Sequence, residues 1–360
     1  MKILFLCTCF DSTLKKRVKA LQDDNNIIDV LDILEYKMVF DTGKTISIRP
    51  KSKYKIFEYL FVLDEINEYV RRRELFDYLD NYDLVEIYKC SQYAVHLRDK
   101  IKNISLKYVI TPNEILPKNS GDIINLYNDS KLFFFQEDLK KRKFQLSFGY
   151  KNNILLYDPV KFFEEFDKIK TNILDEFINY LNIDTNKKIL FTQMNGPLSK
   201  QKSLLKSIAN LPKSIKTEVT FILYFENGTD DMHQELEMIL ENISLDYLIV
   251  NKTASNEQLA MLLKLASTSI FINPNIHDEL LLTSLYAKNH LFLFEPKNID
   301  PIFHDNQIFI DNFIHIKNIF EDDEINREIF REIFNRNKTI VESLFHPKKF
   351  TQRYLEEVVK

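Results

Sequence analysis

Histidine and cysteine, the residues that most often bind metals or act as nucleophiles, have no spacing in this sequence that is typical of either role. The 3 cysteines include Cys7 and Cys9, which lie two apart in a short apolar run and would share one face of a strand. The 7 histidines include no metal-binding pair, since His277 beside Asp278 offers one ligand pair at most. There is also no Walker loop, no GxGxxG motif and no nucleophile elbow. We therefore expect no metal site and no cofactor, and nothing here favours a dehydrogenase or a kinase.

Charge is divided unevenly between the two halves of the chain. Residues 1–160 carry 26 Lys and Arg against 23 Asp and Glu, whereas the remainder is acidic and brings the net charge of the 360 residues to −4. Basic residues of the first half cluster at 49–55, 71–73 and 140–143. Such clusters usually form a solvated surface, and contact with an anionic acceptor or a membrane surface is the functional alternative. Nucleic acid is not expected as a partner, because the chain is acidic overall and has no aromatic and basic binding module.

Composition and the first residues favour a globular protein of the cytoplasm. Hydrophobic residues make up 45% and charged residues 28% of the chain, which is enough apolar mass for a core. The apolar start, MKILFLCTCF, is interrupted at once by Asp11 and the basic run 15–17, which is typical of a first strand and not of a signal peptide. The longest apolar runs are too short to cross a bilayer. We expect a cytoplasmic location, with peripheral contact at the inner face of the membrane as an extension through the basic first half.

Short apolar runs that alternate with helical patterns predict parallel sheets covered on both faces. In the first half the expected strands are residues 2–7, 27–33, 84–88, 107–110, 132–135 and 154–157. Leu14, Val18 and Leu21 mark one face of a helix between the first two of these strands. Residues 160–183 are then typical of one long amphipathic helix without a strand, and this break predicts a domain boundary.

After the long helix the alternation of strands and helices starts again and predicts a second domain. Its expected strands are 188–192, 219–225, 247–250, 269–272 and 291–294, its expected helices are 200–210, 230–242, 256–266 and 278–288, and the tail is helical at 322–344 and 350–359. We therefore expect an α/β protein with two Rossmann-like, doubly wound domains that face each other across a cleft. The expected divisions are a first domain at 1–160, a linker helix at 161–187, a second domain at 188–345 and a helix at 346–360 that crosses back to the first domain.

The order of these segments resembles the GT-B glycosyltransferases, in particular the large retaining family that includes many bacterial lipopolysaccharide, capsule and glycoprotein transferases. DSKLFFFQEDLKKRKFQLSFGYKNNILLYDPV follows the family's segment from a strand through a charged helix to the last strand of the first domain. In the second half, KKILFTQMNGPLSKQKSLLKSI, TASNEQLAMLLKLASTSIFINP and DELLLTSLYAKNHLFLF occur in family order at family spacing. HPKKFTQRYLEEVVK is similar to the family's terminal helix. The resemblance covers essentially the whole chain.

The resemblance implies transfer of a sugar from a nucleotide-diphosphate donor to a saccharide, lipid-linked or protein acceptor. The family binds the donor diphosphate with a Gly-Arg pair and a later Lys. The matching residues here are Asn195, Gly196 and Lys200, so the Arg is missing. Lys200 and the helix amides near Ser199 would then bind the diphosphate. The alternative is that Lys200 is an ordinary surface residue in the first turn of a helix.

The resemblance also implies two glutamates eight positions apart, one beside the reacting sugar and one that binds the ribose hydroxyls. Asp278 or Glu279 matches the first, as candidate catalytic residues. Ser284 or Tyr286 stands where the second belongs, so the ribose carboxylate is missing. The alternative for Asp278 and Glu279 is an acidic helix N-terminus that stabilises its own helix.

The remaining implied contacts come from both domains. They are Asn251 and Lys252 in the donor site, and Ser12, Asn113 and Glu114 on the acceptor side. The family's glycine-rich turn after the first strand is replaced by residues 9–13, where Ser12 or Asp11 would cap a helix. Close approach of backbone to a phosphate is harder without glycine.

Two functions of different classes stay open. The first is an active transferase, which needs no covalent nucleophile because the departing phosphate takes the proton of the acceptor. The second is a GT-B scaffold without catalysis that acts as a partner or acceptor-binding subunit of an active glycosyltransferase. The combined loss of the Arg, the ribose carboxylate and the glycine turn favours the second. The first is preferred, because distant transferases vary these positions.

Overall fold

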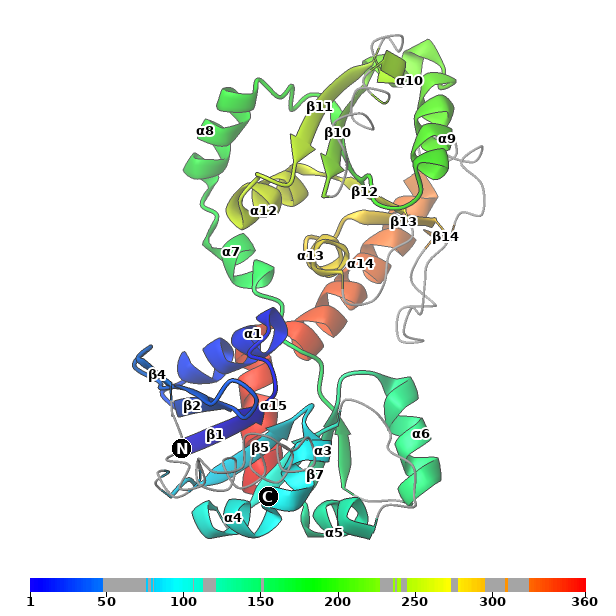
Figure 1. The fold of residues 1–360 in the computed structure, drawn as a ribbon. Helices are drawn as coiled ribbons and strands as arrows, with labels where there is room; N and C mark the ends of the chain where they lie inside the picture. The colour runs from blue at the N-terminus through cyan, green and yellow to red at the C-terminus, as the bar shows by residue number, and fades with distance from the viewer. Residues whose placement is uncertain are drawn as a thin grey trace, which may run out of the picture. The chain divides into compact units, whose positions relative to one another are not determined.

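The computed structural model describes residues 1–47, 76, 79, 81–105, 107–112, 121–149, 152–226, 236, 238–240, 245–272, 278–294, 308–309 and 324–360. The chain forms two compact units, and Figure 1 labels most of their elements. The first unit contains Met1–Pro159 together with Pro347–Lys360, and the second contains Val160–His346. In these described ranges, no helix is long and apolar enough to span a membrane.

The first unit is built on a mainly parallel sheet. Its strands are β1 (Lys2–Cys7), β2 (Ile27–Asp32), β3 (Lys37–Val39), β4 (Thr45–Ser47), β5 (Leu84–Tyr88), β6 (Tyr108–Thr111), β7 (Leu132–Phe135) and β8 (Asn153–Leu155). Its helices are α1 (Ser12–Gln22), α3 (Ser91–Ala94), η2 (Val95–Leu97), α4 (Arg98–Ile104), α5 (Gly121–Asp129), α6 (Asp138–Phe148) and α15 (Pro347–Val359). The described strands form one sheet in the order β4-β3-β2-β1-β5-β6-β7-β8. All are parallel except β3 and β4.

The antiparallel strands β3 and β4 are a difference from the expected sheet. Each spans 3 residues, which is too short for a periodic pattern to be recognised in the sequence. The turn between them is closed by the backbone N–H of Phe40, which donates to the carbonyl of Lys44 at 2.9 Å. Gly43 in this turn has a φ of 79°, a conformation that glycine adopts without strain.

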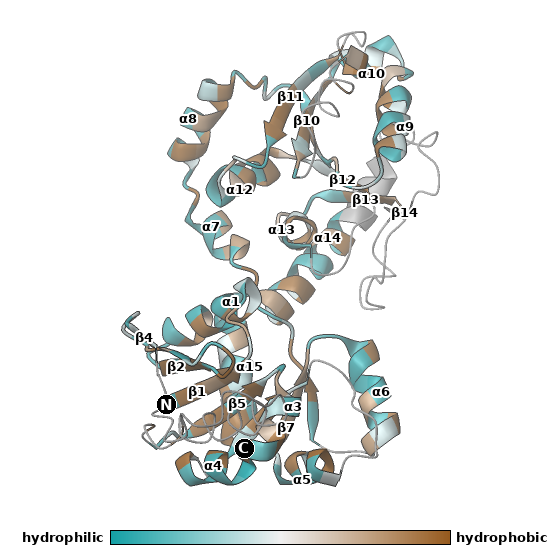
Figure 2. Cartoon of the chain, viewed as in Figure 1, coloured by the Kyte–Doolittle hydropathy of each residue, from teal (hydrophilic) through white to brown (hydrophobic). Residues whose placement is uncertain are grey.

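The central parallel strands β1, β5, β6 and β7 are buried on both faces, and Figure 2 shows β1 and β5 as largely hydrophobic. Two hydrophobic clusters share the residues of β1 alternately. Leu4 and Leu6 belong to one cluster, and Ile3 and Phe5 belong to the other. Since successive side chains of a strand point to opposite faces, the two clusters lie on the two sides of the sheet. This explains why the strands appear in the sequence as continuous apolar runs.

The C-terminal helix α15 packs on the first unit. Phe350, Tyr354 and Val358 are four residues apart and therefore share one face of the helix. They are buried in the same cluster as Leu14 and Val18 of α1. The helix is thus held on this unit by an apolar stripe.

The second unit is built on a fully parallel sheet. Its strands are β9 (Lys188–Gln193), β10 (Val219–Phe225), β11 (Asp246–Asn251), β12 (Thr268–Ile272), β13 (His290–Phe294) and β14 (Ile308–Phe309). Its helices are α7 (Phe162–Lys168), α8 (Thr171–Leu181), α9 (Leu198–Ala209), α10 (Lys213–Thr217), α12 (Asn256–Leu265), α13 (Glu279–Tyr286) and α14 (Glu324–Phe345). The described strands lie in the order β11-β10-β9-β12-β13-β14, the order of dinucleotide-binding domains. The expected α/β fold with Rossmann-like domains is confirmed.

The expectation of one long helix over 160–183, and with it of a single linker helix at 161–187, is wrong. Two helices, α7 and α8, replace it, and the chain between them is extended at Ile169 with a ψ of 109°. The side chain of Ile169 is buried, and its carbonyl accepts a hydrogen bond from Lys264 Nζ at 3.0 Å. This tertiary contact competes with continuation of the helix. The helix expected at 230–242 lies largely outside the described residues.

Candidate functional site

A cavity of about 490 Å³ lies at the carboxyl edge of the second sheet. It is lined by residues of the second unit alone: Phe162, Gln193, Asn195, Tyr224, Glu226, Lys252, Ala254, Asn256, Leu259, Ile272, Asp278, Glu279 and Leu280. Gln193 and Ile272 are the last residues of β9 and β12, the neighbouring strands at which the strand order reverses. Doubly wound sheets bind their ligands at this point.

Glu226, which the sequence pattern did not single out, directly follows β10 and lines the cavity. Its Oε2 atom accepts hydrogen bonds from Asn195 Nδ2 at 2.6 Å and from Gln193 Nε2 at 3.4 Å. The carboxylate is therefore positioned by two side chains from the end of β9. The signal that could have identified it is an acidic residue directly after the second strand of a βαβ unit.

Asp278 lines the cavity and also caps α13. Its Oδ1 atom accepts hydrogen bonds from the backbone N–H groups of Leu280 at 3.0 Å and Leu281 at 3.3 Å. Burial raises the pKa of Asp278, the hydrogen bonds from these amides offset part of the rise, and the charge of Glu226 adds to it. Because Asp278 already occupies these amides, the N-terminus of α13 is closed to a phosphate.

The N-terminus of α9 differs from those of α12 and α13. The N-cap of α9 is Pro197, which forms no side-chain cap, whereas Ser255 caps α12 through a hydrogen bond from the N–H of Gln258. Gly196, which precedes Pro197, has a φ of 113°, and its carbonyl accepts a hydrogen bond from Gln201 Nε2 at 2.9 Å. Of these three helices, α9 is the one without a side-chain cap. The amide of Lys200 donates to the carbonyl of Pro197 at 2.9 Å, so the amides of Leu198 and Ser199 are the ones that an anion could bind at this end.

The cavity is acidic. Among its described lining residues, Glu226, Asp278 and Glu279 are carboxylates and Lys252 is the one basic side chain. No described residue forms a hydrogen bond with the buried Oδ1 atom of Asn195. Hydrogen-bond acceptors therefore outnumber donors, which favours ligand groups that donate, such as hydroxyls. The described part of the chain contains no group of three or more His, Cys, Asp or Glu side chains that could hold a metal ion.

Four of the expected donor residues lie outside this lining: Gly196, Lys200, Asn251 and Ser284. Lys200 is half-buried in the first turn of α9. Asn251 is exposed at the end of β11, and its Oδ1 atom accepts a hydrogen bond from the backbone N–H of Thr253 at 3.1 Å. The structure thus brings Asn195, Lys252 and the acidic pair after β12 to one cavity, and Lys200 and Asn251 are not part of its lining.

The two positions considered for the ribose carboxylate face the interior of the unit. Ser284 is fully buried, and its hydroxyl donates to Ser269 Oγ at 3.1 Å. The hydroxyl of Tyr286 donates to Asp167 at 2.9 Å, and its ring stacks on Phe163 with 4.4 Å between centroids. The expected donor contact of Ser284 is therefore corrected, because α13 is buried along its length between the sheet and α7.

On the first unit the expected acceptor residues are only partly described. Ser12 is exposed at the first position of α1. The N-cap is Asp11, whose carboxylate accepts a hydrogen bond from the N–H of Leu14 at 2.7 Å. Asn113 and Glu114 lie outside the described residues.

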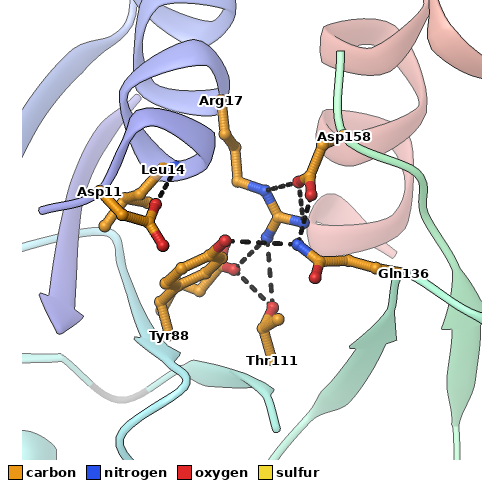
Figure 3. A network of polar contacts seen from close by, with 8 residues as sticks. Asp11, Leu14, Arg17, Tyr88, Thr111, Gln136 and Asp158 are labelled. Carbon is orange, nitrogen blue, oxygen red and sulfur yellow. Dashed lines mark hydrogen bonds and ion pairs between the residues drawn. The ribbon is translucent and has the colours of Figure 1, made fainter. Parts of the chain in front are cut away.

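A buried ion pair stabilises the first unit, and Figure 3 shows the polar network around it. The side chains of Arg17 on α1 and Glu86 on β5 are both 0% exposed and are 2.5 Å apart. Arg17 also donates through Nη1 to Thr111 Oγ1 and pairs through Nε and Nη2 with Asp158. Burial alone would lower the pKa of Arg17, but the charges of Glu86 and Asp158 outweigh burial and raise it. The sequence offered two signals of this ion pair: an Arg next to the apolar stripe of α1 and a Glu inside an apolar strand.

No family model and no curated protein matches this chain. Solved structures do match over its full length. Anabaena HepE in complex with UDP has a TM-score of 0.61 at 13% identity and covers 100% of both chains. A glycosyltransferase from Rickettsia africae has a TM-score of 0.61 at 12% identity and covers 100% of this chain and 99% of its own. UDP-GlcNAc 2-epimerase from Neisseria meningitidis, bound to UDP-GlcNAc, has a TM-score of 0.63 at 13% identity and covers 100% of both.

These identities are too low to carry an activity from one protein to another, and the similar structures include both a transferase and an epimerase. What they share with this chain is the architecture. The chain therefore has the GT-B fold, with two Rossmann-like units.

Proposed function

We propose that the chain is a glycosyltransferase that binds a nucleotide-diphosphate sugar in the cavity of the second unit and transfers the sugar to a saccharide, lipid-linked or protein acceptor. The observation that carries this proposal is the place of the cavity, at the reversal of strand order in a Rossmann-like sheet. Structures of Anabaena HepE with UDP and with UDP-glucose have the same fold, and they support a nucleotide sugar as the ligand class.

The groups around the cavity suit different parts of such a ligand. The open amides of α9, together with Lys200, would stabilise the diphosphate, whose charge grows as the glycosidic bond breaks. The acceptor-rich lining suits the hydroxyls of the ligand. As the bond to the acceptor oxygen forms, the departing phosphate takes the acceptor's proton, so the protein contributes position and charge and no nucleophile.

The charge of the cavity favours a second function. In this alternative the chain is a catalytically inactive partner or acceptor-binding subunit of an active glycosyltransferase. Three carboxylates face one lysine among the described lining residues, and this balance repels a diphosphate. The closed N-terminus of α13 removes one place at which a phosphate could bind.

A lipid-linked acceptor would bring the first unit to a membrane surface. In the described residues the basic cluster 140–143 lies on α6, where Lys140 pairs with Glu137 and Arg142 pairs with Asp138. Part of its charge is therefore neutralised. The clusters at 49–55 and 71–73 lie outside the described residues. Binding to anionic vesicles that weakens as salt is added would support this contact.

The test uses the purified full chain with UDP, GDP and CMP and with their sugars. A ligand that binds the folded state raises its stability by about 2.7 kcal/mol at a hundred times the dissociation constant, which a thermal-shift screen detects. Release or transfer of the sugar, followed by NMR, would support the transferase. Binding without any turnover, in the presence of candidate acceptors, would favour the inactive partner. If no nucleotide bound, the transferase proposal would fail.

A further inference from the structure

The carboxylate of Glu226 has a position in the fold that nucleotide-binding sheets use to recognise ribose. β9, α9 and β10 form the first βαβ unit of the second sheet, and Glu226 is the residue directly after β10. In doubly wound dinucleotide-binding domains, an acidic residue after the second strand accepts hydrogen bonds from the ribose hydroxyls. The topology therefore places a ribose-type acceptor in the cavity already described.

The contacts of Glu226 hold one of its oxygens and leave the other for a ligand. Asn195 and Gln193 both donate to Oε2, at 2.6 and 3.4 Å. Gln193 is 2% exposed, so one of these donors is itself fixed in the interior. Among the described residues, Oε1 accepts no hydrogen bond. A carboxylate fixed in this way can accept hydrogen bonds from two adjacent hydroxyls.

The other candidates for this role are committed elsewhere. Ser284 and Tyr286 occupy the positions at which the GT-B resemblance places a ribose carboxylate, but they are buried against Ser269 and Asp167. Asp278 uses Oδ1 to cap α13. Glu279 also lines the cavity, but it belongs to α13, whereas Glu226 directly follows β10, the strand end at which such sheets bind a ribose diol.

We propose that Glu226 binds the 2′ and 3′ hydroxyls of the ribose of the nucleotide. It would replace, from the end of β10, the carboxylate that α13 lacks. This inference rests on the proposed nucleotide-sugar site. It predicts that the affinity of the protein depends on the ribose diol only while Glu226 is present.

The experiment compares UDP and GDP with their 2′,3′-dideoxy analogues by isothermal titration calorimetry. The wild-type chain should bind the ribose form roughly tenfold or more tightly than the dideoxy form, as expected for a hydrogen bond to a charged group. Glu226→Gln should reduce this ratio about fivefold, since a neutral amide forms the weaker bond, and Glu226→Ala should bring it to about 1. Glu257→Gln is the matched control, because Glu257 is exposed in the first turn of α12 and does not line the cavity. It should keep the wild-type ratio.

The outcomes separate this inference from the proposed function. If a nucleotide binds and the ribose-to-dideoxy ratio is the same in Glu226→Gln, Glu226→Ala and the wild type, Glu226 does not recognise the diol and the inference is overturned. If neither UDP nor GDP binds the wild type, the nucleotide site itself is wrong and both proposals fail. Circular dichroism of each variant confirms that it is folded.

Discussion

Replacement of Arg17 by methionine would leave Glu86 buried without its charged partner. The guanidinium of Arg17 is fully buried and contacts Glu86, Thr111 and Asp158. Methionine has a similar aliphatic stem but forms none of these hydrogen bonds. The side chain of Glu86 is also fully buried, so water cannot take the place of the lost partner without rearrangement of the core.

The expected loss of stability is large. Removal of one member of a buried ion pair costs about 3–5 kcal/mol. Arg17 also lies 5.2 Å from the ring centroid of Tyr88, a cation–π contact that methionine would lose. With a urea m-value of about 2 kcal/mol/M, the unfolding midpoint of the first unit should fall by about 2 M.

A double variant tests whether the pair is the cause. Arg17→Met combined with Glu86→Leu removes both charges, and it should be more stable than Arg17→Met alone. The hydroxyl of Thr111 donates to Glu86 at 2.6 Å, so the double variant loses this bond and should remain less stable than the wild type.

The assay is urea unfolding followed by far-UV circular dichroism, with hydrogen exchange of β1 and β5 peptides to assign the transition to the first unit. Lys19→Met is the control on the same helix, since Lys19 is exposed and its ion pair with Asp23 lies at the surface. Its cost should be about 0–1 kcal/mol. The reasoning is refuted if Arg17→Met lowers the midpoint no more than Lys19→Met does. It is also refuted if the stability lost by the double variant equals the sum of the losses of Arg17→Met and Glu86→Leu, each measured alone.

Three other substitutions test the second unit. Lys200→Ala should weaken binding of a nucleoside diphosphate by more than about 1 kcal/mol if Lys200 contacts the phosphates. The control is Lys206→Ala, in the last turn of α9, which should not weaken binding. Equal affinities of the Lys200→Ala variant and the wild type in calorimetry would show that Lys200 is an ordinary surface residue. Ser284→Glu should lower the melting temperature of the second unit, because it buries a carboxylate between α13 and β12; an unchanged melting temperature would contradict the packing. Asp278→Asn keeps a capping oxygen and removes the charge. Burial raises the pKa of Asp278 above 3.8, so the folded state binds more protons than the unfolded state, and wild-type stability falls as pH rises from that value through the raised pKa. Asp278→Asn should lack this loss, so its stability relative to the wild type should rise over the same pH window. Urea unfolding at several pH values would contradict this if the difference in stability between the two proteins did not change with pH.

The longer parallel strands of both sheets could be predicted from the sequence alone, whereas the short strands β3, β4 and β14 were not expected. β1 and β10 occupy the expected residues 2–7 and 219–225. A strand that is buried on both faces carries its apolar residues in one continuous run, so the run is visible without knowledge of its neighbours. The stripe of Leu14 and Val18 on α1 was predictable for the same reason, because helical periodicity is local.

The sequence also indicated part of the candidate site. Asn195, Lys252, Asp278 and Glu279 follow different parallel strands, and the carboxyl ends of parallel strands meet at one edge of a sheet. These residues do line one cavity. Their chemical roles stay predictions, because the fold places the side chains but does not show a ligand.

Only the tertiary structure decided which distant groups meet. Glu86 looked like an irregularity in an apolar strand, and its partner Arg17 lies 69 residues earlier in the chain. Ser284 is interior because its side of α13 faces β12, where its hydroxyl donates to Ser269 Oγ. The helix α7 ends before Ile169, whose carbonyl accepts a hydrogen bond from Lys264. The carboxylate of Glu226 is positioned by hydrogen bonds from Asn195 and Gln193, which form only in the folded protein. Local periodicity indicates whether a position is buried. Hydrogen bonds and ion pairs between segments far apart in the chain form only in the folded protein. These contacts determine the charge of the site and which of its polar atoms are left for a ligand.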